Sequence, residues 1–404
     1  MNGASLALYV HWPFCVSKCP YCDFNSHVRP HIDEEAWLEG LLADMRHEAA
    51  ATAGRTLASI FFGGGTPSLM RPATVAALIE EALRLWPAEM PEITLEANPS
   101  SVEAARFAGF AAAGVNRVSL GLQALDDAAL KVLGRPHDVA QGLAALDIAQ
   151  KNFERVSIDL IHSRPGQKSR DWEKELARAL AFGTGHLSAY QLTIEEGTRF
   201  HTLARKGLLA LPPEDEAADM YELTGALAEA AGLPLYEVSN HARPGEESRH
   251  NLQYWRYGTY AGIGPGAHGR RGGLAITRIR RPESWLDQVR ARGDGIESAT
   301  PIEPWQAAEE ALLMGLRLVQ GIEADLFLAR TGRTLESVAP AKARARLEAM
   351  GLLQPGAALR VTATGRMLTN RILLELLSGL ETAAVAADFG RPETEIAARK
   401  ETAP

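Results

Sequence analysis

Short apolar runs rich in β-branched residues alternate with amphipathic helical runs from the N-terminus to about Leu192. A period of two predicts strands and a period near 3.6 predicts helices. The helical spacing is clear after Asp33, an expected N-cap, where one face carries Trp37, Leu38, Leu41, Leu42 and Met45. Ser100 and Glu103 predict a capping box in front of another helix. The pattern predicts six strands: Leu6–His11, Leu57–Phe62, Glu92–Ala97, Arg117–Gln123, Arg155–Ile161 and His186–Thr193.

Six strand–helix units of roughly 30 residues each predict a parallel sheet with right-handed crossovers. Further helices are expected around Val75–Leu83, Gln141–Asn152 and Asp171–Ala181. Six units are too few for a closed eight-stranded barrel. The predicted fold class is therefore α/β, with an open or partial (β/α)6 barrel.

The strand–helix alternation stops at about Glu195. A helix at Glu214–Ala231 and a strand at Leu235–Val238 follow, and then a glycine-rich run that contains Pro265 and fits a loop. After an expected helix at Glu303–Leu318, residues 341–377 show a helix, a short hairpin and a helix, a winged-helix-like α+β pattern. We expect a core at 1–240, a linking segment at 241–300, a smaller domain at 301–380 and a tail at 381–404.

Composition narrows the possible functions. The 404 residues carry a formal net charge of -8, which argues against binding to nucleic acid or to anionic membranes. The winged-helix-like segment at 341–377 carries several basic side chains, but they do not outweigh the acidity of the whole chain. We therefore expect no nucleic-acid partner. Neither a signal peptide nor a transmembrane segment is expected. A cytoplasmic protein is predicted.

The sequence contains three cysteines, Cys15, Cys19 and Cys22, spaced C-x3-C-x2-C. Three thiols cannot form a closed set of disulfides. A structural zinc site would need a fourth ligand, whereas three thiolates on a [4Fe-4S] cluster leave one iron open. Scattered free thiols would rarely fall within one short loop. The pattern favours a metal cluster with a free coordination position.

This motif resembles that of the radical S-adenosylmethionine (SAM) superfamily, with Tyr21 before the last cysteine. The resemblance implies a (β/α)6 fold, a [4Fe-4S] cluster and SAM on the open iron. In parallel sheets, ligands bind beyond the carboxyl ends of the strands. Polar residues end several predicted strands here, and each alone has an ordinary explanation as a helix cap. Together they form a ring, and the resemblance implies that SAM is held by Tyr9, Tyr21, Gly64, Gly65, Thr66, Glu96, Gln123, Arg135 and Asp159.

The glycines at 63–65 add a physical argument, because missing side chains let backbone N–H groups approach an anionic ligand. Asn98 also follows a predicted strand. Arg135 has the weakest physical support because it lies in a loop. One departure concerns the loop after the fifth strand, where Ser163 and Arg164 replace a glycine and an apolar residue typical of the family.

Over residues 1–380 the chain resembles the coproporphyrinogen-dehydrogenase-like family, which includes oxygen-independent dehydrogenases of haem synthesis and haem chaperones of the HemW type. The dehydrogenases have a fourth cysteine where this chain has Phe24, and a longer segment before the cluster than the fourteen residues here. The chaperones carry His-Asn-x-x-Tyr-Trp, present as His250, Asn251, Tyr254 and Trp255. Imidazole can ligate haem iron, and aromatic rings can pack on the macrocycle.

The resemblance implies a haem chaperone that binds haem and transfers it to an acceptor, with respiratory haem proteins among the candidates. No porphyrin oxidation is expected, and SAM cleavage stays open. The alternative is a radical SAM dehydrogenase acting on a porphyrin. A redox sensor that uses the C-terminal domain is a more distant alternative. For the motif itself, the alternative is a hydrogen-bonded structural His250 and a core Trp255. The resemblance also suggests a homodimer.

Overall fold

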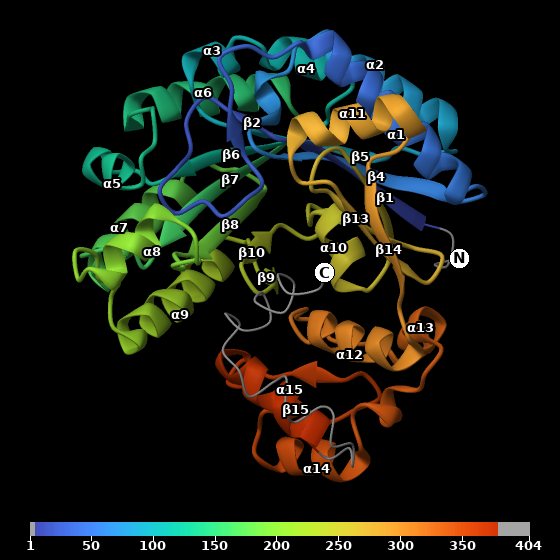
Figure 1. The fold of residues 1–404 in the computed structure, drawn as a ribbon. Helices are drawn as coiled ribbons and strands as arrows, with labels where there is room; N and C mark the ends of the chain where they lie inside the picture. The colour runs from blue at the N-terminus through green and yellow to red at the C-terminus, as the bar shows by residue number, and fades with distance from the viewer. Residues whose placement is uncertain (1–4, 379–404) are drawn as a thin grey trace. The chain divides into compact units, whose positions relative to one another are not determined.

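The computed structural model describes residues 5–378, and the predicted tail at 381–404 lies outside them. The chain divides into two compact units, residues up to 254 with 258–301, and residues 255–257 with 302 onward. The first unit is built on a twelve-stranded open sheet in the order β14-β13-β12-β11-β1-β4-β5-β6-β7-β8-β10-β9 (Figure 1). Its strands are β1 Ser5–Trp12, β4 Thr56–Gly64, β5 Glu92–Ala97, β6 Arg117–Gln123, β7 Arg155–His162, β8 His186–Gln191, β9 Leu235–Glu237, β10 Asn240–Ala242, β11 Thr259–Ile263, β12 His268–Arg271, β13 Leu274–Arg278 and β14 Ile296–Pro301.

The six predicted strands are present as β1 and β4–β8, and each pairs in parallel with the next. The helices of this unit are α1 Glu34–Ala51, α2 Pro72–Leu85, α3 Ser101–Ala104, α4 Phe107–Ala112, α5 Asp127–Val132, α6 Val139–Asn152, α7 Ser169–Leu180, α8 Arg199–Arg205, α9 Glu214–Ala230, α10 Arg249–Trp255 and α11 Pro282–Arg292, with a 3-10 turn at Pro67–Leu69. The Asp33 cap is confirmed, since its side chain accepts from the Ala36 N–H. The fold class predicted from the sequence is confirmed.

The parallel strands have one apolar face and one polar face, because successive side chains point to opposite sides. In β5, Ile93 and Leu95 join the buried apolar core, while Glu92, Thr94 and Glu96 point to the other side. The same alternation continues along the neighbouring strands. We call this second side the polar face; its members include Tyr9, Ser59, Glu92, Thr94, Glu96, Arg117, Ser119, Arg155, Ser157, Asp159, His186 and Ser188.

Residues 241–300 were expected to form a linking segment, and the structure places most of β10, all of β11–β13 and most of β14 in this range, as strands of the large sheet. The loop prediction for the glycine-rich run is wrong for Gly262, which lies in β11 and pairs with Tyr9 of β1. A Cβ at Gly262 would stand 2.0 Å from the His268 carbonyl oxygen, so the hairpin requires glycine there. This antiparallel extension is held to α1 by Arg278, whose buried guanidinium pairs with Asp44 and Glu48.

The second unit has its own apolar core, which includes Leu312, Phe327, Leu347 and Ile372. It contains α12 Pro304–Gly315, α13 Ala324–Thr331, α14 Ala341–Ala349, the hairpin β15 Leu353–Gln354 with β16 Arg360–Val361, and α15 Thr369–Ser378, with 3-10 turns at Leu335–Ser337 and Arg366–Leu368. The predicted order of helix, hairpin and helix is present.

Candidate cluster and SAM site

The three cysteines follow β1: Cys15 ends the short strand β2 Phe14–Cys15, and Cys19 and Cys22 lie in the loop between β2 and β3 His27–Val28. All three are partly exposed and free. Each sulfur has a polar neighbour: Thr66 Oγ1 donates to Cys15 Sγ at 3.4 Å, Arg135 Nη1 donates to Cys19 Sγ at 3.4 Å, and Ser26 Oγ lies 3.9 Å from Cys22 Sγ. Hydrogen bonds to sulfur stabilise thiolates and tune a bound cluster.

The donor set fits a [4Fe-4S] cluster. The thiols are reachable, lie on one short loop and face hydrogen-bond donors, and in a cluster each thiolate binds its own iron. Within residues 5–378, no group of three or more His, Cys, Asp or Glu side chains could hold a single metal ion. Burial raises the pKa of the Cys15 and Cys22 thiols, against the hydrogen bonds from Thr66 and the Phe24 backbone respectively.

A chain of polar contacts joins the cysteine loop to the ends of β4, β5 and β6. Arg135 donates to Asn98 and, at 3.2 Å, to the Gly121 carbonyl, and Asn98 Nδ2 donates to Thr66 Oγ1 at 3.1 Å. Arg135 therefore lies between Cys19 and the strand ends, although it comes from a loop. Its position could not be derived from the strand pattern, because the reach of the Gly134–Pro136 loop depends on the fold.

Three amides of the glycine turn after β4 are already hydrogen-bonded within the protein. The amides of Gly65 and Thr66 donate to the carbonyls of Trp12 and Phe14 at 2.7 and 2.8 Å, and the Gly64 amide donates to Glu96. The expectation of free amides is therefore wrong for these three residues. The glycines are needed for close packing: a Cβ at Gly64 would lie 2.5 Å from the His11 ring, and one at Gly65 would lie 2.6 Å from the Phe14 carbonyl oxygen.

Glu96 and Asp159 lie on the polar face, partly exposed. Burial, together with the Asp159 charge, raises the pKa of Glu96 to about 8. Burial also raises the pKa of Asp159, although hydrogen bonds from Ser188 and Ser119 oppose it. Ser119 Oγ lies 3.0 and 3.2 Å from the two Asp159 oxygens. Two neighbouring carboxyls that resist ionisation are suited to a cationic ligand, which would restore their charge.

Tyr9 and Tyr21 flank the same region. The Tyr9 hydroxyl lies 3.0 Å from His11 Nδ1, and His11 Nε2 lies 2.9 Å from the Asn25 carbonyl on the cysteine loop. Burial raises the Tyr9 pKa well above its ordinary value. The Tyr21 ring packs near Phe200 at 6.2 Å. Gln123 ends β6 with a φ of 65°, a left-handed conformation that is uncommon outside glycine.

The sequence interpretation did not include His11 and Ser119. A period-two polar pattern was already present in β5, β6 and β7, as in Glu92, Thr94 and Glu96, and it would have pointed to Ser119. No comparable sequence pattern points to His11, because its contact with the Asn25 carbonyl depends on how the cysteine loop folds back onto β1.

Ser163 and Arg164, which depart from the family pattern, make contacts of their own. Ser163 has a φ of 57°, and its Oγ lies 3.0 Å from His162 Nδ1. Arg164 forms a largely buried ion pair with Glu175, which also accepts from the Leu125 amide at 2.6 Å. Through Glu175, Arg164 therefore connects the loop after β7 to the loop after β6.

The His-Asn-x-x-Tyr-Trp run forms helix α10. His250 is buried, with an exposed fraction of 2%. Its Nδ1 lies 3.0 Å from Ser59 Oγ and its Nε2 lies 3.2 Å from the Tyr254 hydroxyl. Asn251 and Trp255 are partly exposed, and Trp255 is the residue at which the second unit begins. Both nitrogens of His250 are thus occupied, so this arrangement does not fit an axial ligand of haem iron.

Comparison with known proteins identifies the family of this chain. Residues 9–179 match the Radical SAM superfamily and residues 302–368 match the HemN C-terminal domain. The chain is 38% identical to the protein named Heme chaperone HemW of Escherichia coli, over 83% of this chain and 88% of that protein. This chain belongs to the HemW family of radical SAM proteins.

Other relatives support the same placement. The HemW of Mycobacterium tuberculosis is 36% identical over 93% of this chain and 96% of its own length. The bovine radical S-adenosyl methionine domain-containing protein 1, named as mitochondrial, is 43% identical over 78% of this chain and 74% of its own length. The solved structure of E. coli coproporphyrinogen III oxidase HemN has a TM-score of 0.78 at 22% identity, covering 94% of this chain and 91% of that chain, which shows the shared fold. In residues 5–378, no helix is long and apolar enough to cross a membrane.

Proposed function

We propose that this protein is a haem chaperone, which binds haem and passes it to an acceptor protein. The proposal includes a [4Fe-4S] cluster on Cys15, Cys19 and Cys22 and an exchangeable SAM. The observation that carries it is the similarity to proteins named haem chaperones along nearly the whole chain, at 32–38% identity. The presence of the full motif from His250 to Trp255 is consistent with the same function.

The polar residues around the cysteines have specific roles in this proposal. When bound, the cluster would offer one open iron to the amino and carboxylate groups of SAM. Thr66 and Arg135 would hold the thiolates through their hydrogen bonds to Cys15 and Cys19. Glu96 and Asp159 would attract the cationic parts of SAM, because binding a positive charge offsets the burial that raises their pKa values.

The alternative is a porphyrin dehydrogenase, which the HemN fold would also accommodate. Phe24 argues against it. Its side chain is 60% exposed at the position where the dehydrogenases carry a fourth cysteine. A phenyl ring offers no ligand to iron and no exchangeable proton.

The cellular setting and partners are also part of the proposal. A reducing compartment would keep the three thiols free for the cluster, and the cytoplasm of a bacterium meets that condition. The acceptor would be a haem protein, with a respiratory one among the candidates. A homodimer and the division into segments 1–240, 241–300 and 301–380 are retained as proposals about the assembly and domain roles.

The deciding experiment uses one anaerobic, cluster-reconstituted preparation for three measurements. Haem titration should show saturable binding, and the electron paramagnetic resonance spectrum of the reduced cluster should change on addition of SAM. Coproporphyrinogen should not be converted to protoporphyrinogen. The matched control is Cys19→Ala, which should lose the cluster signal and the SAM effect. Robust conversion of coproporphyrinogen, or no saturable haem binding, would refute the chaperone function.

A further inference from the structure

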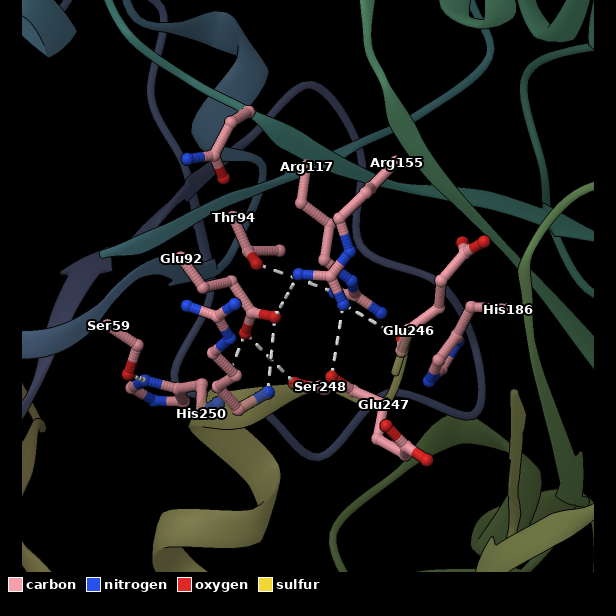
Figure 2. A network of polar contacts seen from close by, with 12 residues as sticks. Ser59, Glu92, Thr94, Arg117, Arg155, His186, Glu246, Glu247, Ser248 and His250 are labelled. Carbon is pink, nitrogen blue, oxygen red and sulfur yellow. Dashed lines mark hydrogen bonds and ion pairs between the residues drawn. The ribbon is translucent and has the colours of Figure 1, made fainter. Parts of the chain in front are cut away.

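Helix α10 begins on a buried network of charged and polar side chains at the amino ends of β5 and β7 (Figure 2). Glu92 accepts from the backbone amides of Arg249 and His250, both at 3.1 Å. Arg155 pairs with Glu92 at 2.7 Å and also donates to the carbonyls of Glu246 and Glu247 at 2.8 and 3.0 Å. Side chains of the sheet thus hold the backbone that leads into the helix.

Within this network, the His250 side chain joins the helix to β4, while Gln253 of the same helix hydrogen-bonds Ser5 of β1. Figure 2 shows its ring directed at Ser59 of β4. The ring is also enclosed by aromatic neighbours, with Phe61 stacked at 4.8 Å and Tyr254 edge-on at 4.9 Å between ring centroids. His250 and Tyr254 are four residues apart, so they share one face of the helix.

The neutral His250 imidazole has one nitrogen lone pair, and a hydrogen bond already occupies it. Burial lowers the pKa of His250 to about 3, against the nearby Glu92 charge, so the imidazole is neutral at pH 7. A neutral imidazole has one N–H donor and one acceptor nitrogen. The hydroxyls of Ser59 and Tyr254 occupy these two positions. An iron–imidazole bond would require one of these hydrogen bonds to open and the buried ring to leave its aromatic neighbours.

We propose that His250 is a positioning residue, which fixes α10 against the polar face, and that it is not the axial ligand of haem iron. Its side chain would set the orientation of the motif helix, and haem affinity would depend on it only through that orientation. The part of this inference that concerns haem rests on the proposed function. The anchoring part does not, because it concerns the folded protein without haem.

The test compares His250→Gln, His250→Ala and Ser59→Ala with the wild type in the full-length, cluster-reconstituted protein. Gln can place an amide nitrogen near the position of Nε2 but is a poor iron ligand. Ser59→Ala removes the partner of Nδ1 from β4 and leaves the motif sequence intact. The measurements are thermal unfolding without haem, haem titration, and the optical and paramagnetic spectra of the haem complex, each with and without added imidazole.

We expect each variant to unfold at a lower temperature, with His250→Ala the least stable and Gln partly restoring stability. Haem affinity should fall about five-fold for Ser59→Ala, in line with the loss of one hydrogen bond. The spectrum of the haem complex should stay that of the wild type in His250→Gln. Added imidazole should affect the haem spectra of His250→Gln and of the wild type in the same way.

The inference is overturned if His250→Gln changes the haem spectrum, imidazole restores it, and Ser59→Ala binds haem like the wild type. Unfolding temperatures equal to the wild type in all three variants would overturn the anchoring role. If the wild type binds no haem, the proposed function fails, and the unfolding temperatures still decide whether His250 anchors α10.

Discussion

The raised pKa of Glu96 links the pH dependence of folding stability to SAM binding, and both can be measured. Glu96 lies on the polar face, where burial and the Asp159 charge raise its pKa from the ordinary 4.5 to about 8, although the Gly64 amide and Arg117 act in the opposite direction. At pH 7 the folded protein without SAM therefore keeps this carboxyl mostly protonated. In the unfolded chain the same carboxyl is ionised, so folding must take up a proton.

The substitution Glu96→Gln removes this cost. One pH unit corresponds to about 1.4 kcal/mol. Keeping the carboxyl protonated at pH 7 in the folded protein, when its pKa in the unfolded chain is about 4.5, therefore costs about 3 kcal/mol of folding free energy. Because the side chain is partly exposed, water reduces the effect, and we expect the variant to be more stable by about 1–3 kcal/mol at pH 7. The amide oxygen of Gln can still accept the hydrogen bond from Gly64.

The sign of the pH dependence follows from the raised pKa. The contribution of Glu96 to the free energy of unfolding is fully present below pH 4.5 and is lost as the pH rises to about 8. The advantage of Glu96→Gln should therefore be near zero at the acid end and grow until about pH 8. In the proposed SAM site, Gln at position 96 could not supply the negative charge of Glu96 to the ligand, so SAM affinity should fall at least about ten-fold.

Urea unfolding of the SAM-free protein across this pH range measures the first effect, and calorimetric SAM titration measures the second. The exposed Glu297 provides the control, since Glu297→Gln should change neither quantity. A Glu96→Gln protein that is less stable than the wild type at pH 8, or a stability difference that does not vary with pH, would refute the reasoning.

Three further predictions concern other parts of the first unit. Cys19→Ala should fail to retain a four-iron cluster by iron and sulfide analysis; an unchanged iron content and absorption spectrum would contradict the ligand assignment. Gly64→Ala should destabilise the protein by about 1–3 kcal/mol in denaturant unfolding, because φ is 107° and the added Cβ meets His11; a neutral effect would show that the turn can relax. Arg278→Met should cost about 3–5 kcal/mol, because it leaves the buried Asp44 without its cationic partner and Glu48 with Arg271 alone, whereas the exposed Arg281→Met should change stability little. Equal effects of the two substitutions would count against the buried network.

The sequence alone was sufficient for the parallel core, and it placed the three cysteines on one short segment. The bounds of β5 and β6 agree with the predicted Glu92–Ala97 and Arg117–Gln123, because buried strands are encoded locally by apolar and β-branched runs. The clustering of all cysteines in one loop is likewise local. Period-two polar residues place Glu96 of β5 and Asp159 of β7 on the same face of the sheet, on either side of β6, because alternate side chains of a strand point to one face.

Contacts between distant residues decided the rest. Asp44 and Arg278 are 234 positions apart, and from the sequence Asp44 is one more polar residue on a helix; only the fold shows it buried and paired. Arg135 reaches Cys19 across 116 positions from a loop without a regular pattern. His250 and Ser59 are 191 positions apart, so the motif alone could not show that the imidazole nitrogens are occupied. Side-chain partners across the sheet depend on strand order and loop reach, which local periodicity does not encode.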